Sequence, residues 1–228
     1  MKEFTYIMNK LLEGFGITLG LFAVTLVLSI PLGLLISFGT RSKIKPISYI
    51  CRTLVWIVRG SPLMLQILLI SFIPNMIFKV YNKDLAMALN VSINMLMFIF
   101  VAIAFTINYA CYFSEIFRGA IDSISKGQYE AGQVLGMTKS QIFFKVILLQ
   151  LVKRALPPCS NEIITLVKDT ALASTLGVFD LLATAKSLVN SLVILTPLVY
   201  CAVFYLVFNG LLTIIFSKLE KKLAFYKE

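Results

Sequence analysis

The feature that most constrains this chain is an uninterrupted apolar stretch near its beginning. The 25 residues from Phe15 to Gly39 contain no charged side chain. A helix that crosses a bilayer needs about 20 consecutive, mostly apolar residues, so this stretch is long enough to cross. It is longer than the apolar core of a signal peptide, and further apolar stretches follow it. We therefore predict a retained membrane-spanning helix at 15–39.

Four later stretches share this apolar character. The composition agrees, because 59% of the residues are hydrophobic and only 14% are charged. In soluble domains about a quarter of the residues are charged. In lipid the backbone polar groups must be satisfied within the segment, which a helix achieves. We predict one all-α integral membrane helical bundle, residues 1–228, with five transmembrane helices at about 15–39, 56–78, 86–114, 146–167 and 188–216. The fourth is interrupted by Lys153, Arg154, Pro157, Pro158 and Glu162. For residues 1–14 two alternatives stay open, a short helix on the outer membrane surface or a frayed end.

The cations predict the orientation of these spans. Twelve Lys and Arg residues lie in the 41–52 loop, the 118–145 segment and the C-terminal tail, whereas six lie in the segments on the other side. Cytoplasmic loops carry the excess of positive charge. The N-terminus is therefore predicted outside and the C-terminus inside. The net charge of +10 would suggest a nucleic-acid partner in a soluble protein, but here these loops explain it and no nucleic acid is expected.

Several kinds of catalytic and metal site are excluded by residue counts. The chain has no His, so it lacks a Ser-His-Asp triad, a Cys-His pair and a His-ligated metal. Its four Cys residues are scattered without a CxxC pair, and we expect reduced, buried side chains and no metal site. The phosphate-binding sequence GxxxxGK[ST] is absent. We therefore expect no catalytic residue in this chain.

The segment at about 118–145 is too polar for lipid and contains helix signals. A turn is indicated at 123–127, a short helix from Gln128, and a helix stop at Gly136. Thr138 is placed as an N-cap, with Gln141 completing a capping box. Two short helices that meet at a glycine on the cytoplasmic face suggest a docking element. The alternative is an ordinary loop between spans.

Two sets of motifs resemble a known family. The residues Glu130-Ala131-Gly132, Gly136 and 146–148 follow the EAA loop of ABC-importer permeases, whose pattern is EAA, three residues, Gly, nine residues and I-x-L-P. Gly132 replaces the third Ala of that pattern, Val146 the Ile and Leu149 the Pro. The sequences RGSPLMLQ (59–66), YFSEIFRGAI (112–121), NE (161–162) and KDTAL (168–172) are similar, in family order, to those of the polar amino-acid permeases of the His/Glu/Gln/Arg type.

This resemblance implies a fold, a function and a set of partners. The fold is that of a type I ABC importer permease, which pairs with a second, identical or homologous permease around a translocation pathway. Two ATPase subunits, which hold ATP and Mg²⁺, dock beneath the pair, and an extracytoplasmic protein delivers the amino acid. This chain binds no cofactor itself and is a transport subunit in a bacterial inner or plasma membrane. The residues implied in coupling to the ATPase are Glu130, Ala131, Gly132, Gly136 and Met137.

Polar and ionisable groups inside the spans are the candidates for the substrate pathway, because they are costly in lipid. They are Ser61, Gln66, Asn108, Tyr112, Glu115, Glu162, Lys168, Asp169 and Thr170. Asp169 or Glu115 is suited to the ammonium group of an amino acid and Lys168 to its carboxylate. Alternatives stay open: Glu115 is a cytoplasmic boundary residue paired with Arg118, Lys168 and Asp169 form an external gate or a structural ion pair, and Ser61 and Gln66 only pack between helices. An ATP-independent carrier or channel is the alternative function.

Overall fold

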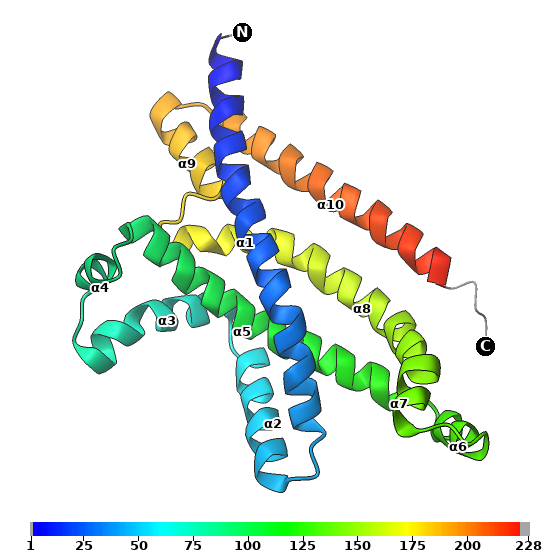
Figure 1. The fold of residues 1–228 in the computed structure, drawn as a ribbon. Coiled ribbons are helices and arrows are strands. Elements are labelled where there is room, and N and C mark those ends of the chain that lie inside the picture. Colours follow the sequence, from blue (N-terminus) through cyan, green and yellow to red (C-terminus); the bar gives the residue numbers. More distant parts are fainter. Residues whose placement is uncertain (1, 224–228) are drawn as a thin grey trace.

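The computed structural model describes residues 2–223, so Met1 and residues 224–228, with Lys227 of the cationic tail, lie outside the described range. Within that range every regular element is a helix (Figure 1), which confirms the all-α prediction. The helices are α1 (Lys2–Thr40), α2 (Lys45–Arg59), α3 (Leu63–Phe78), α4 (Asn82–Ala88), α5 (Ile93–Asp122), α6 (Lys126–Val134), α7 (Lys139–Ile142), a π-helical turn (Phe143–Ile147), α8 (Leu148–Asp169), a 3₁₀ helix (Thr170–Leu176), α9 (Leu181–Leu192) and α10 (Thr196–Leu223).

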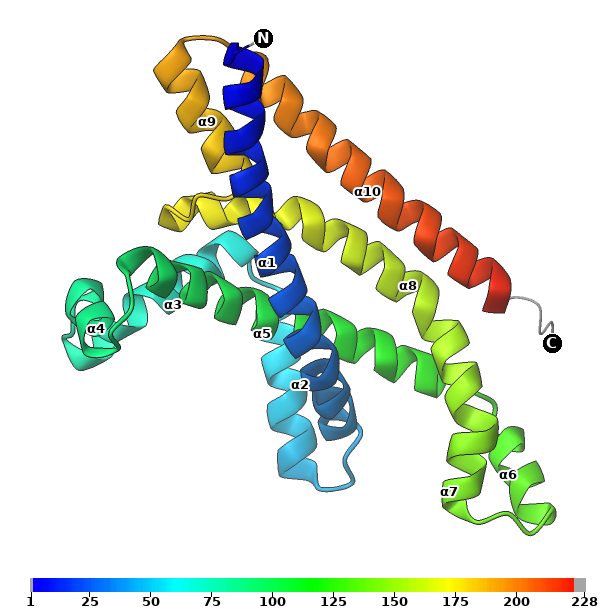
Figure 2. The same ribbon diagram turned by 45° about the horizontal axis from the view of Figure 1, so that its top comes forward.

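Helix α5 lies at the centre of the bundle, where α1 and α8 cross it (Figures 1 and 2). Of the 18 residues in the most apolar part of α5, 67% are buried inside the protein. The corresponding share is 22% in α1 and 6% in α10. Phe105, Tyr109 and Phe113 of α5 form the main core. Gly33 lets α1 approach, because a Cβ there would lie 2.8 Å from the Ala110 carbonyl oxygen. The apolar outer faces of α1 and α10 remain exposed, as expected of helices in contact with lipid.

The first turns of the chain belong to α1. Helix α1 runs without a break from Lys2, so neither a separate surface helix nor a frayed end at 1–14 describes residues 2–14. Ile7 and Leu11 are buried against Leu181 and Ala185 of α9. Part of the apolar face that suggested contact with the membrane surface is therefore covered by protein, whereas Phe4 and Leu12 remain exposed.

Three helices are long and apolar enough to cross a membrane, at Glu3–Thr40, Ile93–Asp122 and Thr196–Leu223 within the described range. Two bent pairs raise the number to five if each pair crosses once: α2 with α3, at 111°, and Lys139–Leu176 with α9, at 55°. The expectation of unbroken helices at 56–78, 86–114 and 188–216 is wrong. The chain breaks at 60–62, at 89–92 and at 193–195, so α5 begins at Ile93 and α10 at Thr196.

Helix α8 continues where an interruption is expected. Pro157 and Pro158 both lie inside it, and it spans Leu148–Asp169 rather than 146–167. Prolines are tolerated in membrane helices where neighbouring groups satisfy the freed backbone. Helix α8 therefore carries its polar residues along one continuous axis.

Candidate functional site

The residues of the coupling segment form a compact pair of helices, which we call the knuckle (residues 126–142). Helix α6 follows Ser125, whose Oγ accepts a hydrogen bond from the Gly127 amide. Gly136 has a φ of +74°, the left-handed conformation that ends helices. The capping box of Thr138 and Gln141 begins α7, with both of its hydrogen bonds formed. The predicted pattern of helix, glycine and capped helix is confirmed, but α6 begins at Lys126 and not at Gln128, so the predicted turn at 123–127 is shorter than expected.

Gly132 holds the two helices of the knuckle together. It is buried, and a Cβ at this position would lie 2.6 Å from Cγ1 of Ile142, which is itself 2% exposed. Tyr129 and Met137 pack against the same cluster. Gly132 and Met137 therefore support the shape of the knuckle from within, whereas Glu130 lies on its surface.

The outward face of the knuckle combines an acidic and several apolar side chains. Glu130 and Ala131 are exposed, and Val134 and Leu135 are 88% and 78% exposed. Large apolar side chains gathered on a surface outside the bundle indicate a protein-binding site. Val134 and Leu135 were not among the residues that the sequence predicted for this site. A Val-Leu pair next to the helix-ending glycine is the signal that identifies them.

A second group of polar residues fixes the bend between α2 and α3. The Gln66 amide nitrogen lies 2.7 Å from the Val58 carbonyl and 2.9 Å from the Ser61 hydroxyl oxygen. Its amide oxygen accepts a hydrogen bond from Asn108 of α5 at 3.0 Å. The structure thus brings Ser61, Gln66 and Asn108 together, and their polar groups satisfy one another at the bend.

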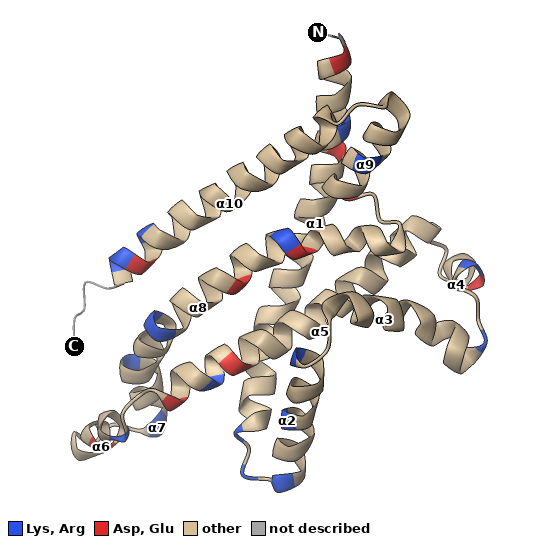
Figure 3. Cartoon of the chain, turned by 180° about the vertical axis from the view of Figure 1, so that it is seen from behind, with Lys and Arg blue, Asp and Glu red and all other residues tan. Residues whose placement is uncertain are grey.

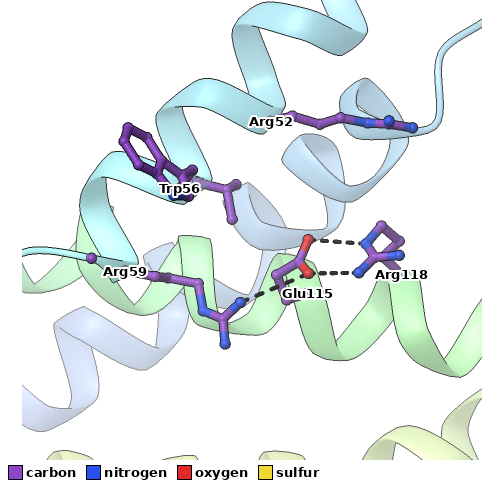
Figure 4. Close-up of a pocket in the computed structure, with 7 residues that line it drawn as sticks. Arg52, Trp56, Arg59, Glu115 and Arg118 are labelled. Carbon is purple, nitrogen blue, oxygen red and sulfur yellow. Dashed lines mark hydrogen bonds and ion pairs between the residues drawn. The ribbon is translucent and has the colours of Figure 1, made fainter.

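A cluster of ion pairs lies between α2 and the second half of α5 (Figure 4). Arg118 donates to both carboxylate oxygens of Glu115, at 3.0 and 2.7 Å, so the expected pairing of these two residues is confirmed. Arg118 also contacts Asp122, which binds Arg41 at the end of α1. Arg59, the last residue of α2, lies 3.7 Å from Glu115.

Arg59 also stacks on an aromatic ring. Its guanidinium lies 5.1 Å from the centroid of the Tyr112 ring, within the range of a cation–π interaction. Arg59, Glu115 and Arg118 line a pocket of about 590 Å³, together with Arg52, Val55, Trp56 and Gly60. In the sequence, Arg59 was noted only as the first residue of the RGSPLMLQ motif. Its contact with Tyr112 joins two helices that are far apart in the sequence, so the sequence carries no signal for it.

The third group lies where α8 meets the 3₁₀ helix. The Tyr109 hydroxyl donates to Asp169 at 2.7 Å, so Asp169 is held by α5. The neighbouring Lys168 is exposed, and the Thr170 hydroxyl donates to the Val167 carbonyl at 2.6 Å. Glu162 lies two turns before Asp169 on the same face of α8 and is half-buried. Figure 3 shows charged positions along α5 and α8, whereas α10 is uncharged until its last turns. Sequence reasoning missed Tyr109, because its partner lies on another helix.

Comparisons with known proteins agree on one family. The sequence model of one protein family, described as the binding-protein-dependent transport system inner membrane component, matches residues 29–225. The L-cystine transport system permease protein TcyB of Bacillus subtilis is 33% identical over 93% of this chain and 86% of its own length. The arginine ABC transporter permease protein ArtQ of Escherichia coli is 33% identical over 76% of this chain and 77% of its own.

Solved structures share the fold. The crystal structure of an amino acid ABC transporter with histidines contains a chain that superposes with a TM-score of 0.83 at 28% identity, over 96% of this chain and 97% of that one. A chain of the MetNI methionine ABC transporter matches with a TM-score of 0.70 at 16% identity, over 98% and 99% of the two chains, which shows a common fold. The chain described here belongs to the family of binding-protein-dependent transport system inner membrane components.

Proposed function

We propose that this chain is the membrane-spanning permease subunit of an ATP-driven importer for a polar amino acid. Each bent pair of helices crosses the membrane once, which gives five spans, with the N-terminus outside and the knuckle and C-terminus in the cytoplasm. The cation distribution supports this orientation, since Arg41 pairs with Asp122 at the end of α5 that leads into the knuckle, and Lys126 and Lys139 begin the two helices of the knuckle. The membrane is the inner or plasma membrane of a bacterium, because the matching family is described as an inner membrane component and the relatives named above come from bacteria.

The observation that carries the proposal is the exposed face of the knuckle. Val134 and Leu135 extend outside the bundle, beside Glu130. A separate ATPase subunit, one of two in the complex, covers this face and hydrolyses ATP with Mg²⁺. The permease binds that subunit and takes no part in the hydrolysis. A channel or an ATP-independent carrier has no need of such a face.

The pathway in this proposal follows the polar line along α5 and α8. Asp169, oriented by Tyr109, and the half-buried Glu162 accept the ammonium group of an amino acid. The relatives named above are permeases for L-cystine and arginine, which supports a polar amino acid as the substrate class. Ser61, Gln66 and Asn108 hold the bend beside this line. A second permease copy or homologue completes the pathway, and an extracytoplasmic binding protein delivers the substrate.

The test is co-purification of an ATPase with the tagged chain from membranes in mild detergent. Leu135→Asp places a charge on the exposed face of the knuckle, and we expect it to abolish ATPase recovery without reducing the amount of permease. Leu195→Asp is the matched control, because Leu195 is 70% exposed between α9 and α10. Recovery of an ATPase with both variants alike would contradict docking on the knuckle. Uptake without ATP and without any co-purifying ATPase would favour the carrier or channel.

A further inference from the structure

The pocket between α2 and α5 has the charge of an anion site. Three arginines, Arg52, Arg59 and Arg118, line it with one carboxylate, Glu115, so its lining has an excess of positive charge (Figure 4). Its volume of about 590 Å³ is sufficient for a small molecule. Trp56 forms part of the wall and is 77% exposed. An amphipathic indole beside guanidinium groups suits a ligand with a charged and an apolar part.

Arg59 is the arginine best placed to bind that anion. Glu115 already accepts two hydrogen bonds from Arg118. The distance from its Oε2 to the nearest Arg59 nitrogen, 3.7 Å, is too long for a hydrogen bond. A guanidinium has five N–H donors in a planar fork that matches a carboxylate. The contacts of Arg59 with Glu115 and Tyr112 orient its side chain without using that fork fully.

The pocket continues the polar line that begins at Asp169. Tyr109 donates to Asp169, and the rings of Tyr109 and Tyr112 lie 6.4 Å apart. Tyr112 in turn lies under Arg59. Asp169 and Arg59 are thus linked by contacts through Tyr109 and Tyr112 of α5.

We propose that this pocket binds the carboxylate group of the transported amino acid, with Arg59 as its main contact. The inference rests on the proposed function and assigns a second position on its pathway, nearer to the knuckle than Asp169. Asp169 and Tyr109 hold the ammonium end first, and Arg59 takes the carboxylate end afterwards. This assignment replaces the exposed Lys168 as the partner of the carboxylate.

The first experiment uses Trp56, the only tryptophan of the chain, as a reporter inside the pocket. The full chain in phosphatidylcholine nanodiscs is quenched with iodide, an anion, and with neutral acrylamide. We expect Arg59→Gln to lower the iodide quenching constant about twofold or more and to leave the acrylamide constant unchanged. Arg41→Gln is the matched control, because Arg41 is an ion-paired arginine outside the pocket. Equal iodide quenching in the wild type and in Arg59→Gln would overturn the anion site.

The second experiment tests which anion occupies the pocket. The complete importer in proteoliposomes is screened with the twenty radiolabelled amino acids, and kcat/KM is measured for the one transported. We expect Arg59→Gln to lower kcat/KM about tenfold or more, Arg59→Lys to lower it less, and Lys168→Gln and Arg41→Gln to leave it near the wild-type value. A loss with Lys168→Gln but not with Arg59→Gln overturns the inference and preserves the proposed function. Transport of no amino acid by the wild type overturns both.

Titration of Trp56 emission distinguishes the remaining sources of an anion. The transported amino acid is expected to change the emission, and its decarboxylated amine is not, with the difference lost in Arg59→Gln. If the emission instead changes when phosphatidylglycerol is added to the nanodiscs, and the amino acid then has no effect, the pocket binds a lipid headgroup and the inference is wrong.

Discussion

Replacing Gly132 with alanine should loosen the packing of α6 on α7, although alanine is the residue that the EAA pattern has at this position. The added Cβ would lie 2.6 Å from Cγ1 and 3.0 Å from Cδ1 of Ile142. Ile142 is 2% exposed and belongs to α7, so it cannot move away without shifting that helix. The loop of this chain is therefore built around a glycine and an isoleucine that fit each other.

The magnitude follows from two opposing effects. Alanine in place of glycine inside a helix favours the folded state by about 1 kcal/mol. Forcing a methyl group into a filled core costs about 1–3 kcal/mol. The net loss is therefore expected at about 1 kcal/mol or somewhat more, which is roughly a fivefold change in the population of the open knuckle. In an Ile142→Ala background the clash is removed, and Gly132→Ala should be neutral or stabilising there.

The measurement is hydrogen–deuterium exchange of peptides that cover 126–142, in the detergent-solubilised full chain. Gly132→Ala should accelerate exchange about fivefold in these peptides and leave peptides of the central part of α5 unchanged. The double variant, compared with Ile142→Ala alone, should show no acceleration. An equal effect of Gly132→Ala in both backgrounds would refute the packing argument, because it would mean that Ile142 is not the residue with which the methyl group collides.

Three further outcomes follow from the structure. Gly136→Val should abolish ATPase co-purification while Gly136→Asn retains most of it, because the φ of +74° strains a β-branched residue and an asparagine adopts it readily. Gly33→Ala should lower the melting temperature in detergent by about 4 °C or more, since its methyl group meets α5, whereas Gly16→Ala, inside α1 with open space around it, should raise it by about 2–4 °C. Tyr109→Phe should lower the melting temperature by roughly 3 °C, and this loss should disappear in an Asp169→Ala background, as a thermal unfolding cycle would show.

The elements set by local signals could be predicted from the sequence. The apolar stretch 15–39 lies within α1, and the glycine and capping box of the knuckle appear where the residue pattern places them. Helix breaks inside apolar stretches were missed, because a hydropathy window does not distinguish a straight span from a bent one. The Gly60-Ser61-Pro62 sequence does carry a breaking signal, since proline disfavours helical backbone in the residue before it.

The polar sites depended on contacts between distant segments. The spacing of Asn108, Tyr112 and Glu115 predicts a shared face of α5, but it does not predict that Gln66 satisfies Asn108 or that Arg59 lies over Tyr112. Such pairs are set by how α2, α3 and α8 pack on α5. The pair of Glu115 and Arg118 was predictable, because residues three apart on a helix are neighbours.

The unbroken path from α7 through the π-helical turn into α8 has a mechanical consequence. Residues 139–169 form one rod without an intervening loop (Figure 1), which at about 1.5 Å per residue is roughly 45 Å long. One end of this rod belongs to the knuckle and the other carries Asp169. A displacement imposed at Lys139 is therefore transmitted along this continuous helical segment, as a translation or as a rotation about its axis. The π-helical turn at 143–147 is the point at which the segment bends most easily.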